Sequence, residues 1–217
     1  MRAFNSKALD IGLAILVLGS IWGLVEVLGG ALSTPYRSGI LMGAGFMVMG
    51  VALSVFKRAW ILPGMVLVTV LCKQLVVPLL HVPPMCMANS CLAIAIGGSS
   101  LAGLYAVAGK SFRRVPIQIG IGASAALLSS VVFLYMGLWL APCPYLLSFS
   151  HAGGLLSFVK AEGVIWAPFT AALLPVGYWV GGHLRTFEVK KPLYYPASAA
   201  ITAVCWLASG FAIVSGI

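Results

Sequence analysis

Seven long apolar stretches divide this chain almost from end to end, and they limit its fold more than any other feature. They cover residues 9–32, 38–56, 59–80, 90–109, 115–140, 163–182 and 196–217. In lipid, stretches of this length satisfy their backbone hydrogen bonds only as helices, and the alternating pattern of a transmembrane barrel is absent. A membrane-crossing helix needs about 20 apolar residues, so we predict an all-α integral membrane protein with about seven (six to seven) transmembrane helices. They should form a compact bundle, a single domain over residues 1–217.

Basic residues gather on one side of this predicted bundle. The chain has 13 Lys and Arg against 4 Asp and Glu, and only 8% of its residues are charged. The N-terminus and the second, fourth and sixth connections hold ten of the basic residues, whereas Arg37 and Lys160 lie on the other side. The positive-inside rule then places the N-terminus in the cytoplasm and the C-terminus outside, as in a multi-pass protein of the cell membrane. No basic run with interleaved aromatic residues suggests nucleic acid as a partner, and the expected surroundings are the lipid bilayer.

Two charged residues fall deep within the predicted spans. Glu26 follows Asp10 by 16 residues and Lys73 follows Arg58 by 15. At 1.5 Å per residue these separations correspond to roughly 24 Å and 22 Å from the inner end. Because the first and third spans run in the same direction, the two charges reach nearly equal depth in the outer half of the bilayer. We predict that Glu26 and Lys73 form an ion pair or line one polar cavity, either as a functional site or only to fix the bundle.

Residues near this pair are suited to a small ligand. Trp22 lies one helical turn before Glu26, on the same face, and Gln74 directly follows Lys73. Arg37 belongs to the first outer connection, from which it could cap a cavity that opens outward. Aromatic walls with a few polar anchors are typical of small-molecule sites, so we predict a substrate-binding site at Glu26, Lys73, Trp22, Gln74 and Arg37.

The third connection and its edges carry soft metal ligands, all on the outer side. They are His81, Met85, Cys86, Met87 and Cys91. Sulfur with imidazole suits copper(I), and zinc less well. A disulfide among Cys86, Cys91 and Cys143 is a second alternative in an oxidising compartment, and plain packing is the third. The spacing from Cys86 to Cys91 matches no zinc pattern, so no metal site is expected and these residues stay candidates only.

Motifs of catalysis are missing from the sequence. It contains no Ser/His/Asp constellation, no H-E-x-x-H and no P-loop. His81, His151 and His183 lie at span ends or in connections, whereas haem held between helices needs histidines deep in the spans. We therefore do not expect an enzyme, and the residues identify no cofactor.

Small residues recur four positions apart in several spans. The pairs include Gly39/Gly43 in the second span and Gly177/Gly181 in the sixth, and the first span carries Ala8, Gly12 and Gly19. Such faces let helix backbones approach closely in membranes. They can pack within the bundle, or the stripe of Ala8, Gly12 and Gly19 can dock a partner subunit.

The first half of the chain resembles the substrate-binding (S) components of energy-coupling-factor transporters and their relatives. The likeness lies in Ser20-Ile-Trp-Gly-Leu-Val-Glu26-x-x-Gly29, in Pro35-x-x-x-Gly39 with the glycine-rich second span, in Leu71-Cys-Lys73-Gln-Leu75, and in Pro84-Met85. The resemblance implies a compact helical protein that binds a vitamin-like or metal substrate near the outer face. It also implies that small residues on the first helix, here Ala8 and Gly12, dock a transmembrane coupling subunit.

This chain departs from that family in two ways. Such components usually have six spans with both termini inside, whereas seven are predicted here. Their metal-binding branch begins Met-His, and this chain begins Met1-Arg2. We expect a substrate-binding or translocating membrane subunit for a small solute. The alternatives are a non-catalytic subunit that anchors a larger membrane complex, and an outer-face protein that handles thiols or metal.

Overall fold

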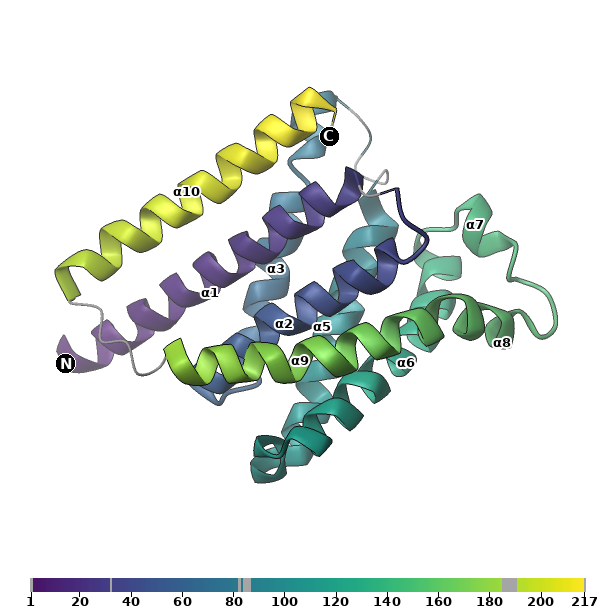
Figure 1. Ribbon diagram of the computed structural model, residues 1–217. Coiled ribbons are helices and arrows are strands. Elements are labelled where there is room, and N and C mark those ends of the chain that lie inside the picture. The colour runs from purple at the N-terminus through teal and green to yellow at the C-terminus, as the bar shows by residue number, and fades with distance from the viewer. Residues whose placement is uncertain (1, 32, 82, 84–86, 185–190, 217) are drawn as a thin grey trace.

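The computed structural model describes residues 2–31, 33–81, 83, 87–184 and 191–216, and it describes no side chain for residues 2–8, 31, 191 and 192. Within these ranges the structure contains helices and no strand (Figure 1). The elements are α1 (Arg2–Leu28), η1 (Gly29–Ala31), α2 (Arg37–Phe56), α3 (Ile61–Lys73), α4 (Val76–Leu80), α5 (Ala88–Ala108), η3 (Gly109–Arg113), α6 (Val115–Leu140), α7 (Pro144–Leu147), α8 (Gly154–Phe158), η4 (Val159–Gly163), α9 (Val164–Leu184) and α10 (Lys191–Ser215).

Seven helical segments of the described chain are long and apolar enough to cross a membrane. They match the seven predicted stretches, which confirms an all-α, multi-pass membrane protein. The sixth segment differs most, because it begins at Gly154 rather than at 163. Here α8 continues through a π-helical turn, η4, into α9. The prediction began the span after Glu162 because this residue is charged. In the structure the helix includes Glu162, whose carboxylate accepts hydrogen bonds from three side chains.

The third segment is interrupted near its end. α3 ends at Lys73, and α4 starts at Val76 after a turn at Gln74 and Leu75. The amide of Gln74 still bonds to the carbonyl of Val70, but the amide of Leu75 bonds to the carbonyl of Cys72. A lysine in the last turn of a helix is favoured by the partial negative charge of the helix end. The interruption therefore places Lys73 where its positive charge is stabilised.

Glycines of α2 and α9 bring these two helices into close contact. A Cβ atom on Gly50 would lie 2.7 Å from the carbonyl oxygen of Leu174, and one on Gly181 would lie 2.6 Å from that of Val51. Gly39 and Gly43 face Ile165 and Phe169 in the same way. The interpretation of Gly39/Gly43 and Gly177/Gly181 as packing faces within the bundle is confirmed.

Only part of the stripe of small residues on α1 is accessible to a partner subunit. A Cβ atom on Gly19 would meet the carbonyl oxygen of Met65 on α3 at 2.9 Å, and Thr69 Oγ1 donates to the carbonyl of Gly19 at 3.0 Å. Gly19 is buried by α3 and so is not available to an external partner, which corrects its place in the predicted docking stripe. Gly12 is exposed, with open space where a Cβ would be, and the side chain of Ala8 lies outside the described part of the chain.

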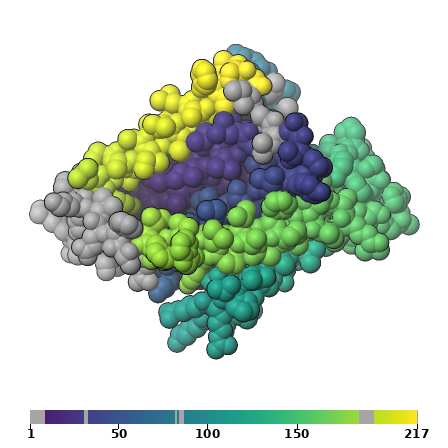
Figure 2. Space-filling model, in the orientation of Figure 1, coloured from purple at the N-terminus to yellow at the C-terminus, as the bar shows by residue number. Residues whose placement is uncertain are grey.

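α10 lies along α1 at one side of the bundle, and α9 crosses between α2 and α6 (Figure 1). Trp206 Nε1 on α10 donates to Ser20 Oγ on α1 at 2.9 Å, and Cys72 Sγ on α3 donates to Ser209 Oγ on α10 at 3.3 Å. Figure 2 shows α10 and α9 as two ridges with α1 visible between them. The odd number of spans leaves the described ends of the chain at opposite ends of the bundle (Figure 1).

The α2–α9 contact gives a test of the packing. A Cβ at Gly177 would collide with the backbone of Met47, which cannot move without shifting α2. We expect Gly177→Ala to lower the free energy of unfolding by about 1–3 kcal/mol, as overpacking does. Gly120→Ala on α6 is the matched control, because a Cβ there meets open space, and it should raise stability by about 0.5–1 kcal/mol. Thermal unfolding of both variants in detergent measures the difference, and equal stability would contradict this view of the interface.

Candidate functional site

The predicted contact between Glu26 and Lys73 is confirmed. Lys73 Nζ on α3 donates to Glu26 Oε2 on α1 at 2.8 Å. Lys73 is 8% exposed and Glu26 is 6% exposed, so the pair lies inside the bundle. An isolated charge at such a position costs several kcal/mol, and the opposite charge with good hydrogen-bond geometry offsets much of this cost. The contact explains how two ionised groups remain in an apolar helical bundle.

The carboxylate of Glu26 has a second donor. Trp22 Nε1 donates to Glu26 Oε1 at 3.3 Å from one helical turn earlier on α1. Trp22 is itself buried, and its ring packs against Gly45 of α2, where only a glycine leaves room. Each carboxylate oxygen of Glu26 therefore has its own hydrogen-bond partner, and both the rotamer of Glu26 and the plane of the indole are fixed.

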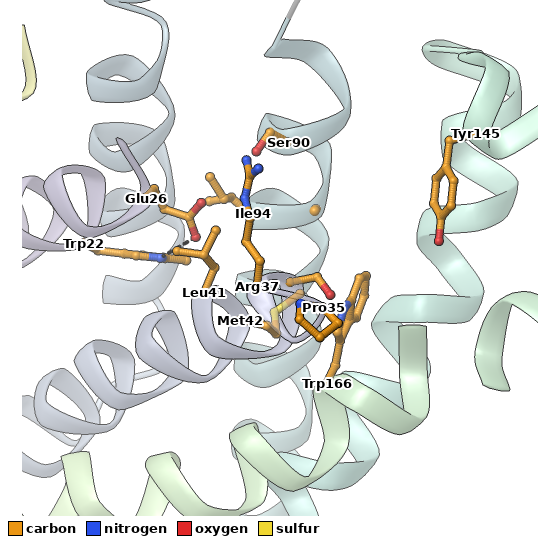
Figure 3. A pocket seen from close by; sticks show the side chains of 12 residues that line it. Trp22, Glu26, Pro35, Arg37, Leu41, Met42, Ser90, Ile94, Tyr145 and Trp166 are labelled. Atoms are coloured by element: carbon orange, nitrogen blue, oxygen red, sulfur yellow. Dashed lines mark hydrogen bonds between the residues drawn. The ribbon is translucent and has the colours of Figure 1, made fainter. Parts of the chain in front are cut away.

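A cavity of about 540 Å³ opens beside this pair (Figure 3). Its wall includes Trp22 and Glu26 on one side, and Tyr145 and Trp166 on the other. A second cavity of about 440 Å³ is lined by Lys73 and by Ile213 of α10, among others. Three residues line both cavities, and they are Glu26, Arg37 and Ser90. The two cavities thus adjoin at the ion pair.

Arg37 stands at the junction of the two cavities. It is the first residue of α2, and Figure 3 shows its guanidinium between Glu26 and Ser90. With the residues that the structure describes, its side chain forms no salt bridge and no hydrogen bond. A guanidinium carries five N–H donors in a planar fork that matches carboxylates and phosphates. Arg37 therefore offers an unused positive charge to whatever enters the cavity.

Gln74 has a different place from the one predicted. Its Nε2 donates to Cys91 Sγ on α5 at 3.4 Å, and Gln74 is not among the residues that line either cavity. Gln74 lies apart from Lys73 because α3 ends at Lys73. The turn that follows directs the side chain of Gln74 toward α5 instead of toward α1. Of the five predicted substrate-binding residues, the structure brings Trp22, Glu26, Arg37 and Lys73 together.

Glu162 belongs to the site and was not identified from the sequence. Its carboxylate accepts from Ser38 Oγ at 2.8 Å, from Tyr145 OH at 2.6 Å and from Trp166 Nε1 at 3.0 Å. All three donors line the larger cavity. Glu162 and Trp166 are four residues apart, as are Trp22 and Glu26. This repeated pairing of a tryptophan with a glutamate one turn away was the signal in the sequence that could have revealed it.

Tyr145 is held as a hydrogen-bond donor at this wall. Partial burial, the hydrogen bond to Glu162 and the negative charge of that carboxylate all raise the pKa of Tyr145 above its ordinary value. A phenol is already protonated at neutral pH, so the raised pKa of Tyr145 keeps it as a donor to Glu162 in alkaline solution as well. Glu162 is thereby tied to both α2 and the segment that precedes α8.

The candidate metal ligands of the third connection do not assemble in the described part of the structure. His81 is exposed after α4, Met87 precedes α5, and Cys91 accepts from Gln74. Met85 and Cys86 lie outside the described residues. Among the residues described, no group of three or more His, Cys, Asp or Glu side chains could hold a metal ion, and Cys91 and Cys143 are free thiols.

No protein-family model, curated protein or solved structure matches this chain. Fold and site define a helical membrane protein whose described residues include seven segments able to span a bilayer and a charged pair beside two adjoining cavities.

The ion pair predicts a strong coupling between its two members. Glu26→Gln leaves Lys73 charged and buried without its partner, and we expect a loss of about 3–5 kcal/mol in the free energy of unfolding. The double variant Glu26→Gln/Lys73→Met removes both charges and should regain most of this loss. Lys160→Gln, at an exposed lysine, is the control and should change stability little. Unfolding in detergent of the wild type, Glu26→Gln, Lys73→Met and the double variant measures the cycle, with Lys160→Gln beside them, and simple additivity of the two single variants would show that the pair is not coupled.

Proposed function

We propose that this protein is a membrane-embedded, non-catalytic subunit that binds or translocates a small solute at the two adjoining cavities. The observation that carries the proposal is the position of the Glu26–Lys73 pair, which forms part of the cavity walls instead of being sealed within the core. A pair that only fixed the bundle would not need access to a cavity. Ionisable groups inside a membrane protein usually mark the path or the site of a substrate.

The shape and lining of the larger cavity suit a small molecule. Its volume of about 540 Å³ lies within the usual range for ligand sites. Trp22 and Trp166 provide two aromatic surfaces, and Ser38, Ser90 and Arg37 provide polar contacts. Aromatic walls with few polar anchors bind a ligand through its apolar body and orient it by its polar group. The resemblance of the first half of the chain to substrate-binding components of energy-coupling-factor transporters supports the same role.

The proposed orientation has the N-terminus in the cytoplasm, the C-terminus outside and the site in the outer half of the cell membrane. The ten basic residues of the N-terminus and of the second, fourth and sixth connections support this orientation, because these segments all lie on the same side of the membrane as the N-terminus in the predicted topology. Glu26 and Arg37 lie toward the end of α1 and the start of α2, away from that side. A substrate would then enter the cavities from outside.

The proposed role includes other membrane subunits as partners. The exposed Gly12 on α1 supports such a contact, because a neighbouring helix can approach its backbone closely. A coupling subunit with ATPases is the partner that the family resemblance implies. Co-purification with a respiratory or photosynthetic complex instead would favour an anchoring subunit.

Removal of the charges should abolish ligand retention. We expect mass spectrometry of small molecules released from the purified protein to find a compound that Glu26→Gln and Lys73→Met both lose. Arg37→Gln should weaken its retention, because the free guanidinium faces the same space. Arg58→Gln, at an exposed arginine on the other end of α2, is the control and should retain the compound. Unchanged retention in the Glu26 and Lys73 variants would refute the proposed site.

The orientation is tested by reporter fusions. Alkaline phosphatase is active only outside the cytoplasm, so a fusion after residue 217 should be active and one after Arg58 inactive. An inactive C-terminal fusion would place both termini inside, as in the six-span components that the first half resembles.

A further inference from the structure

Two polar side chains meet at the junction of the two cavities beside the ion pair. Arg37 at the start of α2 and Ser90 in the first turn of α5 line both cavities, and Figure 3 shows the guanidinium of Arg37 next to Ser90. With the part of the chain that the structure describes, neither side chain forms a hydrogen bond or an ion pair. The ends of two helices therefore bring a planar cation and a hydroxyl, both able to donate, to one end of the larger cavity.

The two carboxylates at the larger cavity already hold donors. Glu26 accepts from Lys73 Nζ at 2.8 Å with one oxygen and from Trp22 Nε1 at 3.3 Å with the other. Glu162 accepts from three side chains of the opposite wall and is not among the residues that line the cavity. A cationic ligand would have to displace one of these donors, whereas an anion meets the N–H groups of Arg37 directly. The polar end of the cavity therefore favours an anionic group.

The rest of the larger cavity is apolar. Leu41 and Met42 on α2 and Ile94 on α5 line the space between its two ends (Figure 3). At the far end Tyr145 and Trp166 turn their polar atoms toward a carboxylate outside the cavity lining, so their rings are what they offer to a ligand. A ligand that fills this space has one polar group at the junction and an apolar body beyond it.

The number and geometry of the donors match a carboxylate. Among the described residues that line the larger cavity Arg37 is the one cation, and the ammonium of Lys73 in the second cavity is held by Glu26. One guanidinium balances one negative charge, and its planar fork binds a carboxylate through two parallel hydrogen bonds. A phosphate ester would bring a second negative charge close to Glu26, where like charges repel. A single carboxylate is thus the anionic group that this end accommodates best.

We propose that the solute is a small monocarboxylate with an apolar body, its carboxylate on Arg37 and Ser90 and its body along Leu41, Met42 and the ring of Trp166. This inference rests on the proposed function, because it names the chemical class of ligand for the same cavity. It gives the charged residues separate parts. Glu26 and Lys73 neutralise each other and fix the wall, and Arg37 supplies the charge that the ligand meets.

The first arm of the test examines the compound that purified, full-length protein retains. Mass spectrometry should identify a carboxylic acid, and treatment with acidic methanol should convert it to a monomethyl ester. A neutral compound, an amine or a phosphate ester would overturn this inference and leave the solute-binding function standing. If the Glu26 and Lys73 variants lose no compound, the proposed function itself fails, and this inference fails with it.

The second arm uses probes that share an apolar body and differ in the charge of the polar end. They are phenylpropanoate, phenylpropanamide and phenylpropylamine, and equilibrium dialysis against the protein in detergent measures their binding. We expect the acid to bind at least about tenfold more tightly than the amide or the amine, because a hydrogen bond between ionised groups is stronger than a neutral one. Phenylethyl phosphate should bind no more tightly than the acid.

Arg37→Gln should abolish the preference for the acid and leave binding of the amide nearly unchanged. The preserved amide binding shows that the variant is folded and its cavity intact. Arg58→Gln removes an exposed arginine that lines neither cavity, and it should keep the preference. Wild-type protein without a preference for the acid would overturn the inference, and so would a preference that survives in Arg37→Gln or tighter binding of the phosphate.

Discussion

The bilayer provides no hydrogen-bond partners, and every polar group of this chain within it must find one in the protein. Backbone groups do so by forming helices. Hydroxyl groups do so across helix contacts, as Thr69 does at the carbonyl of Gly19 and Thr170 at that of Gly122. These bonds are short enough only because a glycine lies at each contact. The same requirement brings Lys73 to Glu26, so the packing of the helices and the charge pair are two results of one constraint.

Much of this arrangement could be predicted from the sequence. Long apolar stretches leave a chain in lipid no alternative to helices, which is why the seven spans were predicted nearly at their observed bounds. Glu26 and Lys73 were predicted to meet because charges are rare within spans and these two reach equal depth. Gly39, Gly43, Gly177 and Gly181 signalled close packing, since a glycine face has little other use in a membrane helix.

What could not be predicted was which face of each helix points inward. Hydrophobic side chains surround these spans on all sides, so the sequence pattern carries little information about rotation about the helix axis. Gly19 was assigned to an external face, and the structure buries it against α3. Gln74 was placed with Lys73, but the end of α3 turns it toward Cys91. For Glu162 the sequence offered only its spacing of four residues from Trp166, because its other donors, Ser38 and Tyr145, come from segments distant in the chain and such contacts have no local signature.

The pairing of each cavity tryptophan with a carboxylate has an optical consequence. Of the chain's six tryptophans, Trp22 and Trp166 line the larger cavity, and each indole N–H is bonded to a glutamate. Trp60, Trp139 and Trp179 are exposed on the outer surface. Indole emission responds to nearby charge and to water, so these two rings are built-in reporters at the place where a solute would displace solvent. The exposed tryptophans line neither cavity beside the ion pair, so their emission gives a background that binding at the proposed site would not change, and such binding could be followed without any label.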